Sequence, residues 1–324
     1  MQTFHSIHER LAPELRLMND IIDRYLHTSN PLMNKVVTTY LQTKGKQIRP
    51  MLVILSAKLC GQVNDSVLHA GAALEMLHNA SLLHDDVVDE TALRRGLPTV
   101  NAAWGNHIAV LVGDFFVSNA LAAGIATGHL SIISALSDLG KELSLGEIDQ
   151  ISNVREHNFD EESYFSAIGK KTASLFVNCA RMGAEAAGAA PDIIPHLVEY
   201  ARLMGLCFQI KDDILDYVGS DSIGKPTGND LREGKVSLPL LYALQAAPVN
   251  LSEPIRNILR RGALSSPEIH DIVGFAISHG GIDYAYDRMR LMQRQGQTSL
   301  ERLPDNPVRE DFADLFEFII SRDK

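Results

Sequence analysis

The sequence contains little of what marks several protein classes. Its three cysteines, Cys60, Cys179 and Cys207, lie far apart and form no C-x-x-C pair, so neither a disulfide framework nor a zinc site is expected. Its formal net charge is -10 over 324 residues, which argues against a general binder of nucleic acid or anionic membranes. The most apolar stretch, 108–125, contains Asp114 and two glycines, so no membrane span is expected.

The overall composition is that of an ordinary globular protein, with 45% hydrophobic and 22% charged residues. The first sixteen residues carry charges throughout and lack the apolar core of a signal peptide. We therefore expect a protein of the reducing cytoplasm. No stretch has the composition of a flexible linker, and residues 1–324 are interpreted as a single domain.

Long proline-free stretches dominate the chain, notably 51–97 and 99–190. They are rich in helix-forming residues with apolar positions three and four apart, and no alternating strand-like run stands out. The sequence therefore predicts an all-α fold. Glycine, proline and polar clusters predict helix breaks near Pro50, Leu97 and Pro98, 188–192, 219–234, 247–253, 280–281 and 296–306.

Two of the predicted helices, 67–89 and 200–217, are apolar nearly all round, which is typical of helices buried inside a bundle. Each ends in the pattern D-D-x-x-D. Because residues four apart share one face of a helix, each motif can present two carboxylates side by side. The aspartates are Asp85, Asp86 and Asp89 in the first motif and Asp212, Asp213 and Asp216 in the second.

Like charges at this spacing repel, and the repulsion is relieved if divalent cations lie between them. Magnesium takes few carboxylates and completes its shell with water and phosphate oxygens, so the paired motifs favour a magnesium site open to a diphosphate. The plainer interpretation of one such motif is a solvated acidic surface, since aspartate is seldom buried. Two copies, each after a strongly apolar helix, favour the metal site.

Basic residues that suit a diphosphate lie beside these motifs. Each alone could be an ordinary surface charge, and a lone helical histidine is more often structural. His78 precedes Asp85 by seven residues, about two helical turns, and therefore lies on roughly the same face. The basic candidates are Lys46, Arg49, Arg94, Arg95, Lys170, Lys171, Lys225 and Lys235.

These motifs resemble those of the trans-isoprenyl diphosphate synthases. Within that family, 82–90 (LLHDDVVDE), 94–96 (RRG) and 112–115 (VGDF) are most similar to the long-chain polyprenyl, octaprenyl-type branch. The resemblance extends from Gly45 to Pro239. It implies a bundle of helices around a deep central cavity, a homodimer, and two acidic motifs that face each other across the mouth of the cavity.

The resemblance also implies roles for single residues. Lys46, Arg49, His78 and Arg95 would bind isopentenyl diphosphate, and Arg94, Lys171, Thr172, Gln209 and Lys225 the allylic diphosphate, with Lys235 a weaker candidate. Asp85, Asp86, Asp89, Asp212, Asp213 and Asp216 would hold about three magnesium ions. The residues expected to act in catalysis are Asp85, Asp86, Asp89, Arg94, Lys171, Asp212 and Asp213.

The expected reaction begins with ionisation, in which the cations stabilise the charge on the departing diphosphate. Isopentenyl diphosphate attacks the allylic cation, and the released diphosphate removes the proton, so no dedicated base is required. The carbonyl and hydroxyl dipoles of Lys171, Thr172 and Gln209 would steady the cation.

The small residues Ala80 and Ser81, one turn before the first motif, predict an open channel and a product longer than farnesyl. Leu77 and Leu74, about 12 and 16 Å from Asp85 at helical rise, are candidate floors. Phe115 or Phe116 on a facing helix would complete the floor. Alternatively, the small residues only let two helices cross.

Four other functions are weighed against long-chain synthesis. A terpene cyclase normally carries a different second metal motif, and a sugar hydrolase fits poorly with one tryptophan, Trp104, and many basic residues. A shorter-chain synthase and a non-catalytic partner subunit of a synthase remain alternatives. The expected partners are the two small-molecule diphosphates and a second copy of the chain, with transient membrane contact for product release and no nucleic acid.

Overall fold

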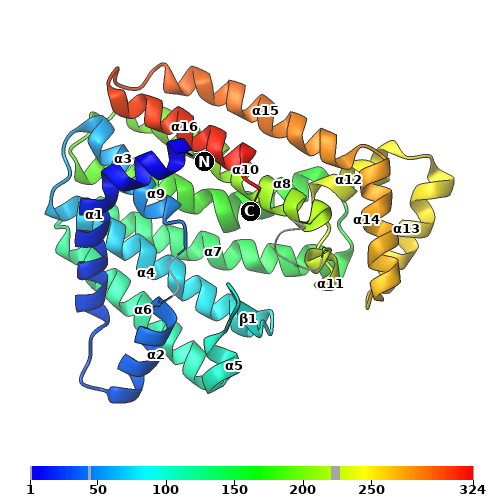
Figure 1. The fold of residues 1–324 in the computed structure, drawn as a ribbon, viewed down its shortest axis with the longest axis horizontal. Coiled ribbons are helices and arrows are strands. Elements are labelled where there is room, and N and C mark those ends of the chain that lie inside the picture. The colour runs from blue at the N-terminus through cyan, green and yellow to red at the C-terminus, as the bar shows by residue number, and fades with distance from the viewer. Residues whose placement is uncertain (1, 43–44, 220–226, 324) are drawn as a thin grey trace.

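The computed structural model describes residues 2–42, 45–219 and 227–323 of the chain. Helices make up most of the described structure, and the only strands in these ranges are two strands of two residues each, which form one hairpin. Figure 1 shows the helices packed side by side, with the N- and C-terminal ends on the same side of the molecule. The all-α prediction is confirmed.

The helices and strands follow the chain in a simple order. They are α1 (Gln2–Leu26), α2 (Pro31–Leu41), α3 (Ile48–Cys60), α4 (Asp65–Val88), β1 (Leu93–Arg94), β2 (Leu97–Pro98), α5 (Val100–Trp104), α6 (Asn106–Ala126), α7 (Leu130–Glu156), α8 (Glu161–Ile168), the π-helix η1 (Gly169–Ala173), α9 (Ser174–Ala186), α10 (Ile194–Val218), α11 (Asn229–Arg232), α12 (Leu238–Ala246), α13 (Val249–Arg261), α14 (Ser266–Ser278), α15 (Gly281–Leu300) and α16 (Pro307–Ser321).

The two helices that carry the acidic motifs lie in the interior, as their apolar sequences predict. Helix α4 packs along α6, and α10 packs against both α9 and α15. The large apolar cluster includes Leu74 and Met76 from α4 and Met204 and Ile210 from α10, all nearly inaccessible to solvent. Burial of these apolar faces, rather than intrinsic propensity, holds both motifs at fixed positions.

Several predicted breaks differ from the structure. Pro50 lies in the first turn of α3, where a proline costs nothing because the N–H it lacks would have no partner in the helix. Gly296 lies inside α15, where a Cβ atom would come within 3.2 Å of Phe316, so the glycine permits close packing. The predicted loop 219–234 contains the short helix α11.

A smaller apolar cluster forms the end of the molecule where α12, α13 and α14 meet, at the right of Figure 1. It includes Tyr217 from the end of α10 and Leu231 from α11, so the second acidic motif lies where the two clusters adjoin. Within the described ranges, one helix, α6, is long and apolar enough to cross a bilayer, a test that core helices of globular proteins also pass.

Candidate active site

Both acidic motifs lie at the C-terminal ends of long helices, where the helix dipole is negative and further negative charge is unfavourable. The end of α4 is held by polar contacts. Its Asp86 carbonyl accepts hydrogen bonds from the Thr91 backbone N–H at 2.9 Å and from Asn101 Nδ2 at 2.9 Å. The carbonyls at this helix end therefore have partners, and the carboxylates are left to interact with cations.

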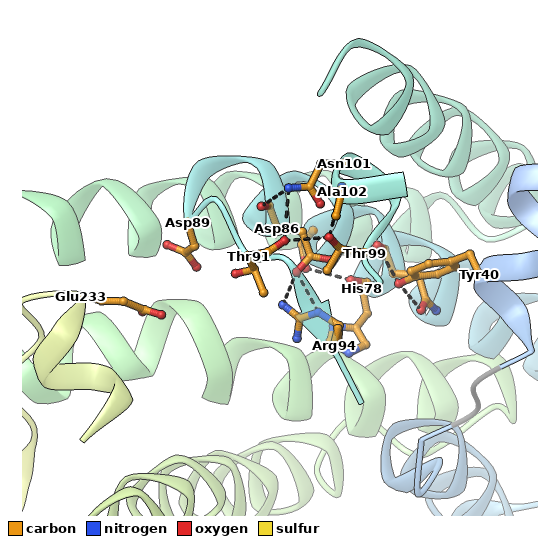
Figure 2. Close-up of polar contacts among 12 residues, drawn as sticks. Tyr40, His78, Asp86, Asp89, Thr91, Arg94, Thr99, Asn101, Ala102 and Glu233 are labelled. Atoms are coloured by element: carbon orange, nitrogen blue, oxygen red, sulfur yellow. Dashed lines mark hydrogen bonds and ion pairs between the residues drawn. The ribbon is translucent and has the colours of Figure 1, made fainter. Parts of the chain in front are cut away.

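Arg94 is brought back onto the first motif by the β1–β2 hairpin. The two central residues of its turn, Arg95 and Gly96, have φ of 53° and 79°, as a tight hairpin turn requires. Arg94 Nε and Nη2 donate to Asp86 Oδ1 at 2.9 and 2.7 Å, and Figure 2 shows this pair. Asp86 is 2% exposed, so its charge is neutralised by arginine within the protein.

Asp85 is the first-motif carboxylate that most needs a cation. Burial raises its pKa to about 6, Lys171 lowers it, and the negative charges of Glu147 and Asp89 raise it further. Lys171 itself is engaged with Glu147 and donates to Gln150 Oε1 at 3.1 Å. Arg94 also lowers the pKa, so two cations serve the three carboxylates of Asp85, Asp89 and Glu147.

Lys171 and Thr172 lie on the π-helix η1, whose extra residue per turn is often found at functional sites. Gly146 on α7 permits this placement, because a Cβ atom there would lie 2.7 Å from the Lys171 backbone nitrogen. Thr172 Oγ1 donates to Gln209 Oε1 on α10 at 2.7 Å. Three predicted site residues from two distant segments are therefore brought together.

Asp213, the second aspartate of the second motif, is 4% exposed and is held by neutral donors. Tyr164 Oη donates to its Oδ2 at 2.5 Å, and Gln209 Nε2 donates to its Oδ1 at 2.9 Å. Burial raises the pKa of Asp213 to about 7, and the two hydrogen bonds act in the opposite direction.

Asp216 fixes the segment that follows the second motif. Its carboxylate accepts from the backbone N–H groups of Asn229 and Asp230, at 3.0 and 3.1 Å, at the start of α11. That segment carries Lys235, whose Nζ pairs with Glu233 and lies 3.8 Å from Asp89 of the first motif. Figure 2 shows Asp89 on the side of the site that faces Glu233. Lys235 therefore links the segment after the second motif to the first motif.

Asp212 pairs with the C-terminal end of the chain. Arg322, just after α16, donates to Asp212 Oδ1 at 2.7 Å and to the Phe208 carbonyl at 2.9 Å. Its guanidinium lies 4.2 Å from the centroid of the Phe208 ring. The Asp212 side chain is 42% exposed, so it remains open to solvent beside this ion pair.

The predicted binding residues for isopentenyl diphosphate also lie together. Burial lowers the pKa of His78 well below its usual value, and the positive charges of Arg49, Arg95 and Arg94 lower it further, so this histidine is neutral at pH 7. Arg49 lies over the Phe176 and Phe208 rings, and its buried Nε has no hydrogen-bond partner in the described part of the chain. Such a group suits an anionic ligand.

Lys46, the remaining residue of this predicted set, lies at the edge of the same region. Its Nζ is 5.5 Å from the centroid of the Phe318 ring of α16. Arg95 lines a small cavity of about 50 Å³ with Gly45, Gln47 and Glu75, among others. The sequence prediction thus grouped residues that the fold does place near one another.

A larger cavity, of about 170 Å³, opens beside the second motif. Polar and apolar side chains share its wall, which suits a ligand with a charged head and a hydrocarbon part. Its lining is Gln150, Asn153, Val154, Asn158, Phe159, Asp160, Tyr164, Ala167, Ile168, Lys171, Thr172, Gln209, Asp213, Asp230, Gly234, Lys235, Val236 and Ser237.

The predicted chain-length residues lie on the facing surfaces of α4 and α6. Leu74, Leu77 and Ala80 of α4 are buried, and Ser81 donates its hydroxyl to the His78 carbonyl at 2.9 Å. On α6, Phe116 is fully buried and Phe115 partly so.

Two further basic candidates remain to be placed. Lys170 pairs with Asp149 at 2.6 Å. Lys225 lies outside the described residues.

Magnesium fits some of the predicted ligands better than others. Within the described ranges, no group of three acidic, histidine or cysteine side chains already converges on a metal position. Asp86 and Asp213 are nearly inaccessible to solvent, and both oxygens of Asp216 accept backbone N–H groups. Asp212 also pairs with an arginine, Arg322, but its side chain is 42% exposed. The carboxylates that fit are Asp85, Asp89 and Asp212, hard oxygen donors at the negative ends of two helices.

Sequence reasoning missed five residues of the site: Tyr164, Glu147, Gln150, Asp230 and Arg322. Glu147 and Gln150 stand one turn apart on a helix in 146–150 (GEIDQ), a pattern that could have suggested a polar face. Tyr164 and Arg322 reach the second motif from 49 and 110 residues away, and only the fold reveals them.

Comparison with known proteins identifies the family. Residues 30–274 match the polyprenyl synthetase family model. The chain belongs to the polyprenyl synthetase family. Octaprenyl diphosphate synthase of Escherichia coli (strain K12) is 33% identical over 319 residues, 98% of each chain. The chain is therefore a prenyltransferase that elongates polyprenyl diphosphates, as its motifs predicted.

Solved structures of the family share the whole fold. A decaprenyl diphosphate synthase from Rhodobacter capsulatus has a TM-score of 0.93 at 30% identity and covers 99% of both chains. A polyprenyl synthase from Caulobacter crescentus CB15, solved with calcium and isoprenyl diphosphate, has a TM-score of 0.93 at 29% identity and covers 99% of this chain and 98% of that one.

Proposed function

We propose that this enzyme extends an allylic prenyl diphosphate by successive head-to-tail condensations with isopentenyl diphosphate, giving an all-trans polyprenyl diphosphate longer than farnesyl. One observation carries the proposal. Lys235, on the segment fixed by Asp216, lies 3.8 Å from Asp89, which brings the segment after the second acidic motif and its lysine against the first motif. A regulatory subunit without activity would have no need of this complete set.

Magnesium is the proposed cofactor, held by Asp85, Asp89 and Asp212. The raised pKa of Asp85 supports a divalent cation there, because burial and neighbouring negative charges leave this carboxylate short of positive partners. The related Caulobacter protein, solved with calcium and isoprenyl diphosphate, supports a divalent site in this fold. When bound, magnesium would neutralise the charge that develops on the leaving diphosphate.

The basic side chains divide between the two substrates. Arg49 and Arg95, with neutral His78 between them, would bind the diphosphate of isopentenyl diphosphate, and Lys46 would close that side. Arg94, Lys171 and Lys225 would bind the allylic diphosphate, with Lys235 above Asp89. Two separate anion sites let both substrates bind at once and place their reacting ends together.

In the proposed reaction, the bond between the allylic C1 and the diphosphate oxygen breaks, and the electron pair leaves with the diphosphate. The double bond of isopentenyl diphosphate then forms the new bond to C1, and the released diphosphate takes the proton from the resulting cation. The protein contributes charge stabilisation and alignment, and no side chain must serve as base. Thr172 and Gln209 would direct oxygen dipoles toward the cation.

Product length would depend on the space between α4 and α6. Ala80 is buried and small, and Leu77 precedes it by about one turn on α4, further from Asp85. Replacing Ala80 with Phe should shorten the main product by one or more isoprene units, because the larger ring would fill the path of the growing chain. An unchanged product after this substitution would remove Ala80 from the product path.

The decisive experiment is incubation of the purified chain with farnesyl diphosphate, labelled isopentenyl diphosphate and magnesium, followed by mass spectrometry of the products. Products at five-carbon steps beyond farnesyl, lost when EDTA is added, are expected. No extension under any metal condition would favour the partner-subunit alternative, and a product that stops at one addition would indicate a shorter-chain synthase.

A homodimer in the cytoplasm is the proposed form of the enzyme. Leu111 and Ile125 of α6 are 58% and 63% exposed, and Ile148 of α7 is 61% exposed. Proteins seldom leave such a surface in water, and a second copy of the chain would cover it. The proposed location is supported by the three free cysteines. Contact with a membrane would be transient, during product release. Light scattering of wild type and Ile125→Glu tests the dimer.

A further inference from the structure

A chain of three hydrogen bonds connects α8, α10 and η1 beside the larger cavity. Tyr164 Oη donates to Asp213 Oδ2 at 2.5 Å, Gln209 Nε2 donates to Asp213 Oδ1 at 2.9 Å, and Thr172 Oγ1 donates to Gln209 Oε1 at 2.7 Å. All four side chains line that cavity. Both oxygens of Asp213 are therefore engaged with residues of the fold.

The direction of each hydrogen bond follows from the donor and acceptor properties of the groups. An ionised carboxylate only accepts, so the amide nitrogen of Gln209 must face Asp213 and its oxygen must face Thr172. The Thr172 hydroxyl proton is thereby committed to Gln209. The lone pairs of the Thr172 oxygen are then turned away from Gln209, where the negative end of the hydroxyl dipole can face a ligand in the cavity.

We propose that Asp213 and Tyr164 are positioning residues, which act through Gln209 to fix the Thr172 hydroxyl as a stabilising dipole for the allylic cation. The inference rests on the proposed prenyl transfer and deepens it. Each bond of the chain polarises the next in a poorly solvated environment, so the hydrogen bond from Gln209 to Asp213 strengthens the dipole at Thr172. Tyr164 holds the carboxylate in place, and its burial excludes water from it.

The arrangement accounts for the burial of an acidic residue that the metal does not need. Asp213 is 4% exposed and accepts a hydrogen bond from the fold on each oxygen, whereas the side chain of Asp212 beside it is 42% exposed. A carboxylate in direct contact with an allylic cation could be alkylated by it. A carboxylate that acts through the Gln209 amide and the Thr172 hydroxyl stabilises the cation, and the group next to the cation is then a hydroxyl, a weaker nucleophile.

The test compares kcat with KM for the allylic substrate in four variants. Tyr164→Phe keeps the ring and removes one bond of the chain, and it should lower kcat about tenfold with little change in KM. Thr172→Val should lower kcat roughly a hundredfold, and Thr172→Ser, which keeps the hydroxyl, should restore most of it. The control is Tyr200→Phe. It removes the buried hydroxyl of a different tyrosine, on α10, which donates to the Phe312 carbonyl.

A fluorinated allylic diphosphate sharpens the test, because fluorine destabilises the cation. The kcat loss in Tyr164→Phe should be larger with this substrate, and the double variant Tyr164→Phe with Thr172→Val should be no slower than Thr172→Val alone, since both act through one chain. An unchanged kcat in Tyr164→Phe, a loss in KM alone, or additive losses would overturn the inference. Should Tyr164→Phe fail to fold, Asp213→Asn takes its place in the comparison of kcat with KM and in the double variant with Thr172→Val. A wild type that elongates nothing would instead overturn the proposed function.

Discussion

The two acidic motifs have the same D-D-x-x-D pattern and serve different ends. In the first motif the carboxylates face cations: Arg94 pairs with Asp86, and Lys235 lies near Asp89. In the second, Arg322 pairs with Asp212, but Asp213 and Asp216 accept hydrogen bonds from side-chain and backbone donors. The difference teaches that helical spacing decides which way a carboxylate points, whereas its neighbours decide whether it binds a ligand or holds the fold.

The corresponding middle aspartates show this most clearly. Asp86 and Asp213 are both nearly inaccessible, at 2% and 4% exposure. One is neutralised by a guanidinium, and the other is solvated by a phenol and an amide. The Asp86–Arg94 pair should respond to the anionic substrate, because the diphosphate competes with Asp86 for the Arg94 guanidinium.

The largest effect should come from removing one of the carboxylates that fit the metal. Asp85→Asn should lower kcat on the order of a thousandfold, because charge stabilisation of the leaving diphosphate is lost. Asp216→Asn, the same chemical change at a second-motif aspartate that holds the fold, should lower kcat far less. Steady-state kinetics with the allylic and isopentenyl diphosphates checks this, and equal losses in the two variants would erase the functional difference between the motifs.

A second effect concerns stability. Asp86→Ala should destabilise the metal-free protein by about 3 kcal/mol, because it removes a carboxylate that is almost fully buried and leaves Arg94 without its partner. Urea unfolding followed by circular dichroism gives the free energy of unfolding. Arg94→Ala serves as the companion variant, and a loss below about 1 kcal/mol in both would show that the pair is solvated.

Asp216→Ala should cost about 1–2 kcal/mol, because α11 loses the carboxylate that accepts its first backbone N–H groups. Lys235 follows α11, so its reach toward Asp89 should be disturbed as well. Hydrogen exchange should rise in residues 229–235 and stay unchanged in α4. Uniform exchange across both regions would mean that Asp216 stabilises the whole fold rather than this segment.

The smallest expected effect is a gain in folding stability when Asp85 is replaced. The folded-state pKa of Asp85, about 6, is above its unfolded value of 3.8, so the folded protein binds the proton more tightly. The metal-free protein should therefore lose stability as pH rises from about 4 to about 6, and the loss should persist above that range. Asp85→Asn should remove this dependence and raise stability at pH 7 by about 1–2 kcal/mol. Thermal unfolding across this pH range in EDTA measures it, and a lower stability of the variant would contradict it.

The sequence was sufficient to predict the all-α fold and the position of both motifs, because their helices are apolar on every face and end in aspartates. The family resemblance also grouped His78 with Arg49 and Arg95, whose charges act on the histidine in the fold. The break expected near Pro50 lies between α2 and α3, whereas the interior position of Gly296 was missed, because it depends on packing against Phe316.

The roles of the second-motif aspartates could not be read from the sequence. Tyr164, Asn229 and Arg322 lie on other elements, and nothing in D-D-x-x-D states which of its carboxylates they reach. The pattern therefore predicts six equivalent ligands, and the fold distinguishes three that are open to a metal. Long-range contacts of this kind have no periodicity along the chain from which they could be inferred.

Calorimetric titration of magnesium with inorganic pyrophosphate into the wild type, Asp212→Asn and Asp213→Asn tests the central difference most directly. Wild type and Asp213→Asn should bind metal-pyrophosphate with similar affinity, and Asp212→Asn should bind it at least tenfold more weakly, a difference of about 1.4 kcal/mol. Equal weakening in the two variants would contradict the account, because it would make Asp213 a metal ligand like its neighbour.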